Sequence, residues 1–95
     1  MELLIEQTHL PYCEMDVGCC KTRVYVEDVE EETLRWHKDR VNAQFKVVGG
    51  KDWMLQLEHE KPVVLEIGKS YYIPKEVMHR IIKGKYNLII EVFEE

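Results

Sequence analysis

Apolar and polar residues alternate along much of this chain. Ala43, Phe45 and Val47 fall on one side of a strand, with polar Gln44 and Lys46 between them. The same alternation gives two further sets: Trp53, Leu55 and Leu57, and Leu88, Ile90 and Val92. Side chains on one face of a β-strand recur at every second residue, whereas a helix would need a 3.6-residue period. The pattern therefore predicts an all-β protein with one buried face in each sheet.

Runs rich in β-branched and aromatic residues give the expected strands, at 3–7, 22–27, 33–39, 41–48, 52–58, 62–67, 70–73, 79–83 and 86–93. The segments 49–51, 59–61, 68–69 and 84–85 between them are short enough to close hairpins. We therefore expect a small antiparallel β-barrel or jelly roll, with residues 1–95 as a single domain. Residues 1–21 are the least regular, and we expect them to form an N-terminal arm.

Composition limits the class of protein and its partners. With 95 residues, 45% of them hydrophobic, the chain suits one soluble domain. A net charge of −5 and the lack of a basic stripe argue against a nucleic-acid partner. No run approaches the ~20 apolar residues of a membrane span, and acids interrupt the N-terminus, so we expect a cytoplasmic protein. The odd number of cysteines, three, fits a reducing compartment.

The segment 68–79 carries a glycine, a proline and a histidine at fixed offsets, namely Gly68, Pro74 and His79. It resembles the second motif of the cupin superfamily, in which glycine, proline, a second glycine, histidine and asparagine recur at these offsets. Glu76 stands at the second glycine and Lys83 at the asparagine. The resemblance implies a small jelly-roll barrel with His79 pointing into its lumen.

The first cupin motif is matched in part upstream. His37 and Gly50 fall at the positions of its first histidine and its glycine, and Asp39 replaces its second histidine. Ala43 then stands at the glutamate position. Gln44 would fit a longer spacer, but the alternation turns it outward, so we prefer the alignment with Ala43.

Three residues of the resembled site keep metal-binding chemistry: His37, Asp39 and His79. Two histidines and one carboxylate form the facial triad that binds Fe(II) and leaves positions open for other ligands. The resemblance thus implies a divalent ion, Fe, Mn, Ni or Zn. It also implies a small-molecule ligand in the lumen, bound by the triad and Lys83. In the alternative without metal binding, Asp39 caps a strand end and the histidines have structural roles.

Two functions remain open at this point. One is a metal-binding or ligand-binding cupin, which could be an enzyme of unknown substrate. The other is a degenerate cupin that acts as a non-catalytic, dimeric binding or sensor module, which the alanine at position 43 favours. Apolar Trp36, Ile82, Ile89 and Phe93 fall on the outer faces of their strands, so we expect a two-fold homodimer.

A second metal site has weaker support. His9, Cys13, Cys19 and Cys20 offer zinc-binding atoms, but adjacent Cys19 and Cys20 do not easily occupy two corners of a tetrahedron. Ordinary reduced cysteines are favoured. The acid-rich segment 27–32 is expected to be a solvated connection.

Overall fold

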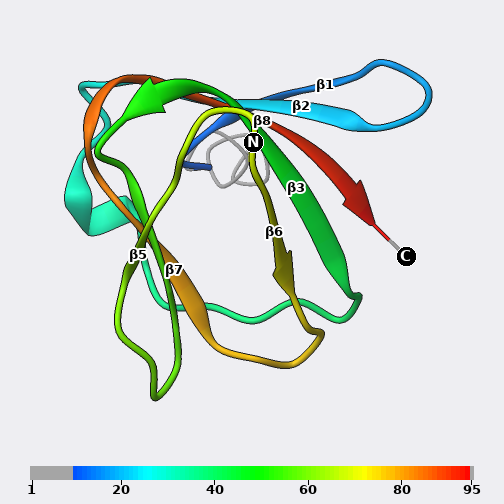
Figure 1. Cartoon of the computed structure of the whole chain (residues 1–95), viewed down its shortest axis with the longest axis vertical. Coiled ribbons are helices and arrows are strands. Elements are labelled where there is room, and N and C mark those ends of the chain that lie inside the picture. Colours follow the sequence, from blue (N-terminus) through cyan, green and yellow to red (C-terminus); the bar gives the residue numbers. More distant parts are fainter. Residues whose placement is uncertain (1–9, 95) are drawn as a thin grey trace, which may run out of the picture.

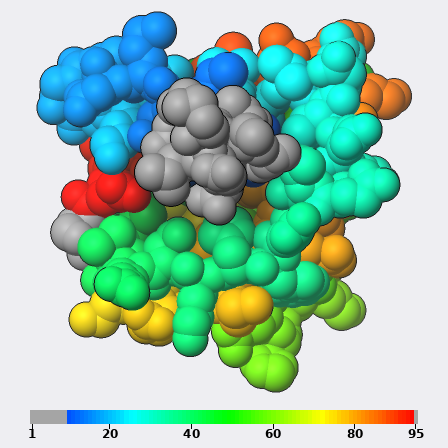
Figure 2. Space-filling view, turned by 180° about the vertical axis from the view of Figure 1, so that it is seen from behind, coloured from blue at the N-terminus to red at the C-terminus, as the bar shows by residue number. Residues whose placement is uncertain are grey.

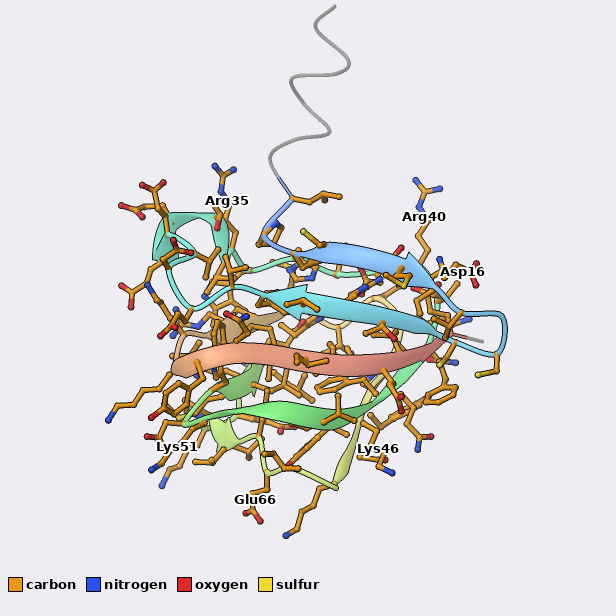
Figure 3. The ribbon with its side chains drawn as sticks, turned by 90° about the horizontal axis from the view of Figure 1, so that it is seen from above. Asp16, Arg35, Arg40, Lys46, Lys51 and Glu66 are labelled. Carbon is orange, nitrogen blue, oxygen red and sulfur yellow. The ribbon has the colours of Figure 1, made fainter. Side chains whose placement is uncertain are left out.

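Two antiparallel sheets pack face to face in the computed structural model, which describes residues 10–94 (Figure 1). The larger sheet has the order β1 (Cys13–Asp16), β2 (Lys21–Tyr25), β8 (Lys85–Glu94), β3 (Ala43–Lys51) and β6 (Ser70–Ile73). Figure 3 shows these strands side by side in that order. The smaller sheet has the order β5 (Val63–Val64), β4 (Met54–Leu57) and β7 (His79–Ile82). The all-β, antiparallel architecture expected from the sequence is confirmed.

The predicted alternation of faces is also confirmed. Ala43, Phe45 and Val47 are buried, whereas Gln44 and Lys46 are exposed. The core combines residues of both sheets: Tyr25, Ala43, Phe45, Val47, Trp53, Leu55, Leu65, Ile73, Ile81, Leu88, Ile90 and Val92. Burial of these side chains is the main term that holds the two sheets together.

The predicted turn at 49–51 is wrong, because β3 runs through these residues to Lys51. Its pairing with β8 shifts register on either side of Gly49, as in a β-bulge. Gly50 has a φ of 109°, and a Cβ atom there would lie 3.1 Å from the Cα of Leu88. Bulges absorb the two glycines, and the turn begins only at Asp52, whose φ is 62°.

The predicted strand at 33–39 is also wrong. A 3-10 helix, η1, covers Glu31–Thr33, and His37 forms only a single bridge to the sheet. The backbone N–H groups of Thr33 and Leu34 donate to the carbonyls of Glu30 and Glu31 rather than to a neighbouring strand. Seen from behind in Figure 2, this segment (cyan) lies across the molecule from the β1–β2 hairpin (blue). The acidic residues of the preceding segment 27–32 are exposed, as expected for a solvated connection.

Residues assigned to the N-terminal arm include one strand that the sequence pattern misses. β1 pairs with β2 at the edge of the larger sheet, in register from Cys13 opposite Val24 to Asp16 opposite Lys21. All of its residues are exposed, so it carries no buried period that would reveal it. The strand expected at 3–7 lies outside the described residues. Among the described residues, no helix is long and apolar enough to cross a membrane.

Candidate metal centre

His37 and His79 are brought together by a pair of backbone hydrogen bonds. The N–H of His37 donates to the carbonyl of His79 over 3.0 Å, and the reciprocal bond is 2.8 Å long. Residues directly opposite each other on antiparallel segments project their side chains to the same side. The two imidazole centroids are accordingly 4.2 Å apart. The predicted convergence of these histidines is confirmed, although one contributing segment is a single-residue bridge and not a strand.

Both rings are fixed in the same tautomer. Nδ1 of His37 lies 2.9 Å from the carbonyl oxygen of Arg35, and Nδ1 of His79 lies 2.9 Å from that of Val77. A carbonyl oxygen can only accept, so each Nδ1 carries the proton and donates it. Each Nε2 therefore keeps its lone pair. Backbone carbonyls orient metal-ligating histidines in this way in many metalloproteins.

Asp39 completes the group of ligand atoms. Its Oδ2 lies 3.6 Å from Nε2 of His79, which is too far for a hydrogen bond. One atom from each of His37, Asp39 and His79 lies within 4.8 Å of the others. An ion bonded at about 2.0–2.2 Å would hold its ligands roughly 3–4 Å apart, so small side-chain rotations would close the set. The donor set therefore fits a divalent ion with two nitrogen ligands and one oxygen ligand.

The loop that carries Asp39 is fastened to the turn before β7. The N–H of Glu76 donates to the carbonyl of Asp39 over 2.7 Å, and the N–H of Lys75 donates to Oδ1 of Asn42 over 2.9 Å. Lys38 and Glu76 add an exposed ion pair of 3.5 Å. Figure 1 shows residues 35–42 crossing the end of the barrel beside this turn. The carboxylate and the buried histidine are thus positioned by segments that hold each other.

Glu76, which stands where the resembled motif has its second glycine, has a left-handed backbone conformation. Its φ is 63°, in the region that glycine occupies without steric cost. The turn before β7 therefore places a residue with a Cβ atom in a strained conformation.

The three candidate ligands differ in how far they are buried, and burial changes the pKa of a histidine. His79 is 3% exposed, whereas the Asp39 side chain is 44% exposed. Burial lowers the pKa of His79 below its ordinary value of 6.5, and His37 lowers it further, while the Val77 carbonyl and Asp39 act in the opposite direction. His79 is therefore neutral at pH 7. The neutral imidazole is the form that binds metals.

Ala43, which stands where the resembled motif has a glutamate, forms part of the wall of the site. Ala43 is buried and lines a narrow cavity of about 40 Å³ together with the three candidate ligands. Glu94, its partner across the β3–β8 ladder, lines the same cavity. The Glu94 carboxylate lies 3.6 Å from Lys21 and 3.7 Å from Arg23. In the described residues, the clustered carboxylate ligand comes from Asp39 alone.

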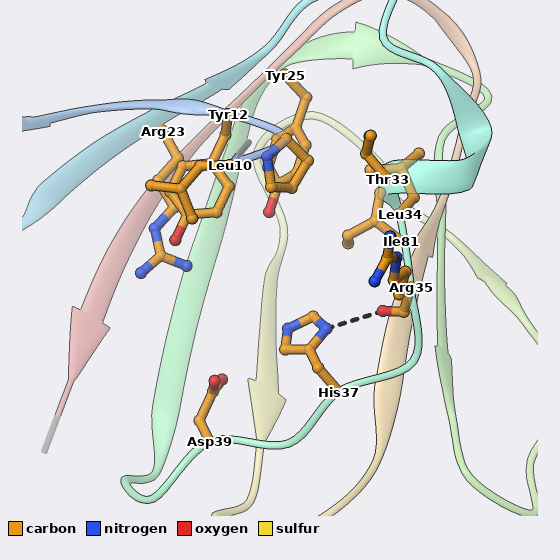
Figure 4. A pocket seen from close by; sticks show the side chains of 11 residues that line it. Leu10, Tyr12, Arg23, Tyr25, Thr33, Leu34, Arg35, His37, Asp39 and Ile81 are labelled. Atoms are coloured by element: carbon orange, nitrogen blue, oxygen red, sulfur yellow. Dashed lines mark hydrogen bonds between the residues drawn. The ribbon is translucent and has the colours of Figure 1, made fainter. Parts of the chain in front are cut away.

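A wider cavity of about 240 Å³ opens beside His37 and Asp39 (Figure 4). Its wall is made by Leu10, Pro11, Tyr12, Arg23, Tyr25, Thr33, Leu34, Arg35, His37, Asp39 and Ile81. Of the residues that the motif comparison identifies, only His37 and Asp39 line it. Arg23 and Tyr25 have no motif signal. Only their two-residue spacing on β2, which turns both toward one face, could have indicated them.

The remaining predicted residues lie elsewhere. Lys83 borders a different depression, together with Glu31, Leu34, Arg80, Ile81 and Ile82. It lines neither the cavity of about 40 Å³ nor the cavity of about 240 Å³ described above. Cys13 and Cys19 are exposed and Cys20 is buried, all as free thiols. His9 lies outside the described residues. Within the described part of the chain, His37, Asp39 and His79 are the one group of this kind that could hold a metal ion.

Comparison with known proteins identifies the architecture. No protein-family model matches the sequence, and no curated protein sequence is significantly similar to it. Solved structures do match. One is an RmlC-like cupin family protein with a double-stranded β-helix fold from Methanocaldococcus jannaschii, with a TM-score of 0.66 and 16% identity over 85% of this chain and 74% of that one.

Two enzymes share the same arrangement of strands. The DMSP lyase DddQ of Ruegeria pomeroyi has a TM-score of 0.69 and 12% identity, and the match covers 80% of this chain but only 36% of the lyase. The Fe(II) form of HppE in complex with its substrate has a TM-score of 0.64 and 15% identity, covering 88% of this chain and 52% of HppE. The present chain thus spans about a third of the lyase and half of HppE.

Proposed function

Because this chain has the cupin fold, we propose that it binds a divalent metal ion through His37, Asp39 and His79. The observation that carries the proposal is the shared tautomer of the two histidines, which leaves both Nε2 atoms free beside a carboxylate. Two histidines and one carboxylate favour Fe(II), with Mn, Ni and Zn as competitors. A bound ion would supply a Lewis acid with open positions for a small-molecule ligand.

The residues around the triad have separate roles in this proposal. His79 is the buried ligand, held neutral by its surroundings. His37 and Asp39 lie at the boundary with the cavity of about 240 Å³, where a ligand would arrive. The Arg35 and Val77 carbonyls hold the imidazoles in place. Core residues such as Phe45 and Ile81 close the apolar side of the site.

Metal analysis of untagged protein tests this proposal. After incubation with Fe(II) or Zn(II) and removal of excess ion, the native chain should retain about one ion per chain, and His79→Ala should retain none. His59→Ala is the matched control, because the His59 side chain is 89% exposed in a turn remote from the triad in sequence. Equal metal content in all three proteins would refute the proposal.

A second function, a non-catalytic sensor or binding module, is favoured by one observation. Ala43 stands where the resembled motif has a metal-binding glutamate. A site with one ligand fewer binds metal more weakly and suits reversible occupancy. Turnover of a bound small molecule would distinguish the enzyme from the module.

We also propose that two chains associate through the outer face of the larger sheet. Phe93 and Tyr72 are 41% and 50% exposed there, and Met15 is 66% exposed. Gln44 pairs with both Phe93 and Tyr72 in the ladders, so these two rings flank one residue on the same face. Large apolar side chains gathered on one sheet face favour burial against a second copy.

A further inference from the structure

Arg23 is a charged residue on the inward face of the larger sheet. It pairs with Ile90 in the β2–β8 ladder, and Tyr25 pairs with Leu88. Both partners are buried core residues, so Arg23 and Tyr25 also face the interior. The Arg23 side chain is only 19% exposed. Burying a guanidinium is costly unless its hydrogen bonds are made, so its surroundings need to account for it.

The contacts of Arg23 fix its orientation and leave one edge available. Nε donates to Oε1 of Glu14 over 2.6 Å, and the guanidinium carbon lies 4.5 Å from the centre of the Tyr12 ring. Nη2 lies 3.7 Å from Oε2 of Glu94, which is an ion pair but not a hydrogen bond. The guanidinium also donates to the Tyr25 hydroxyl. The two Nη atoms carry four of the five N–H donors of an arginine, so the terminal edge can still bind a planar oxyanion with two parallel hydrogen bonds.

This edge belongs to the same cavity as the proposed metal ligands. Arg23, Tyr25, His37 and Asp39 all line the space of about 240 Å³. Figure 4 shows the Arg23 and Tyr25 side chains across the cavity from His37, with the Tyr25 hydroxyl directed into it. Burial raises the pKa of Tyr25, so its hydroxyl stays protonated and can donate. The cavity thus has cationic and hydroxyl donors at one side and two of the proposed metal ligands, His37 and Asp39, at the other.

The charges of the cavity favour a monoanion. Of the charged residues that line it, Arg23 and Arg35 supply two positive charges and Asp39 supplies one negative charge, which leaves one positive charge in the metal-free chain. A single carboxylate neutralises it, whereas a dianion would leave the cavity negative beside the Glu14 and Glu94 carboxylates.

We propose that this cavity binds a small hydroxy-carboxylate, with its carboxylate on Arg23 and Tyr25 and its hydroxyl toward the triad. The hydroxyl end of this assignment rests on the proposed metal function, whereas the carboxylate end does not. A water molecule takes about 30 Å³ in the liquid, so the cavity suits a ligand on the order of eight non-hydrogen atoms. Short hydroxy acids of three to four carbons are of this size.

Calorimetric titration with lactate, 3-hydroxybutyrate and 4-hydroxybutyrate tests the proposal, with lactamide as the uncharged analogue and 2-hydroxyethylphosphonate as the dianion. At least one hydroxy acid should bind the zinc-loaded native chain, and Arg23→Gln should weaken it about ten- to a hundredfold. Lys21→Gln is the matched control. Lys21 forms ion pairs with the same two glutamates as Arg23, Glu14 and Glu94, but it lines neither cavity beside the candidate ligands. Removing its charge should therefore change binding less than about threefold.

Metal content measured on the same samples separates this inference from the proposed function. Hydroxy-acid binding that depends on Arg23 in a chain that takes up no metal would uphold the carboxylate subsite and refute the metal centre. Three results would overturn the subsite: no hydroxy acid binds, lactamide or the phosphonate binds the metal-free chain more tightly than the hydroxy acids do, or Arg23→Gln binds as the native chain does. If Arg23→Gln does not fold, the guanidinium NMR signals of Arg23 in the native chain provide the readout. They should shift on addition of the hydroxy acid, and unchanged signals would overturn the subsite.

Discussion

Replacing Glu76 by glycine should stabilise the turn that holds the proposed metal centre. Glu76 has a φ of 63°, and a residue with a Cβ atom in this conformation costs roughly 1–2 kcal/mol. Glycine removes that cost but loses about 0.4–1 kcal/mol through the greater freedom of the unfolded chain. The ion pair with Lys38 is lost as well. Because both of its side chains are more than half exposed, it contributes only about 0.3 kcal/mol.

The comparison of Glu76→Gly with Glu76→Ala isolates the backbone effect, since both variants lose the ion pair. We expect the glycine variant to be more stable than the alanine variant by about 0.5–1 kcal/mol, or about 3–6 °C in melting temperature for a domain of this size. The same two substitutions at Glu66, an exposed residue with ordinary φ, should rank in the opposite order. Thermal melts followed by circular dichroism measure all four variants. An alanine variant at position 76 that equals or exceeds the glycine variant would refute the reasoning.

Three further predictions concern packing, pH and assembly. Gly84→Ala should destabilise the fold by several kcal/mol in urea titrations, because the new Cβ would clash with the carbonyl oxygen of Lys51; near-native stability would contradict that contact. His79 has a lowered pKa in the folded state, so the unfolded chain binds the proton more tightly. Neutral His79 therefore contributes fully to the free energy of unfolding above about pH 6.5, and this contribution is lost as the pH falls below that value. The urea midpoint of the metal-free chain should therefore decrease as the pH is lowered from 7.5 to 5.5, and it should decrease less in His79→Gln. Parallel pH profiles of the two proteins would contradict the assignment of this effect to His79. Light scattering should give twice the 11.4 kDa chain mass at micromolar concentration and a lower mass for Phe93→Lys, whereas a monomeric native chain would contradict the proposed dimer.

The sheets could be predicted from sequence because residues buried on one face of a strand recur at every second position. Phe45, Val47, Leu88 and Ile90 alternate with polar or partly exposed neighbours, and each lies in the core. β1 could not be predicted in this way, since none of its residues is buried and, among the strands of residues 10–94, it pairs with β2 alone. Edge strands are specified by backbone pairing, which the side-chain pattern does not record.

The bulges in β3 could not be read from sequence either. A pair of glycines is typical of a hairpin turn, and it also suits a strand whose backbone approaches its neighbour closely. Only the position of Leu88 beside Gly50 decides between the two.

The candidate site was only partly accessible to sequence analysis. Motif spacing identified His37, Asp39 and His79 as candidates, because His79 follows Gly68 and Pro74 at fixed offsets and His37 and Asp39 precede Gly50 at others. Arg23 carried no such offset. Its position depends on the ladder between β2 and β8, strands that lie more than sixty residues apart in the chain. Lys83 was predicted from its place at the asparagine position of the motif, but it lies beside a different depression, because it comes just after the end of β7.

Nitrogen-15 NMR of the histidine side chains during zinc titration is the sharpest test of the proposed metal centre. The carbonyls of Arg35 and Val77 fix the proton of His37 and His79 on Nδ1, so both Nε2 signals should shift on metal binding. Both Nδ1 atoms should remain protonated, the signals of exposed His59 should stay unchanged, and the changes should saturate at one ion per chain. Unshifted Nε2 signals of His37 and His79 at saturating zinc, or ligation through Nδ1, would contradict the account.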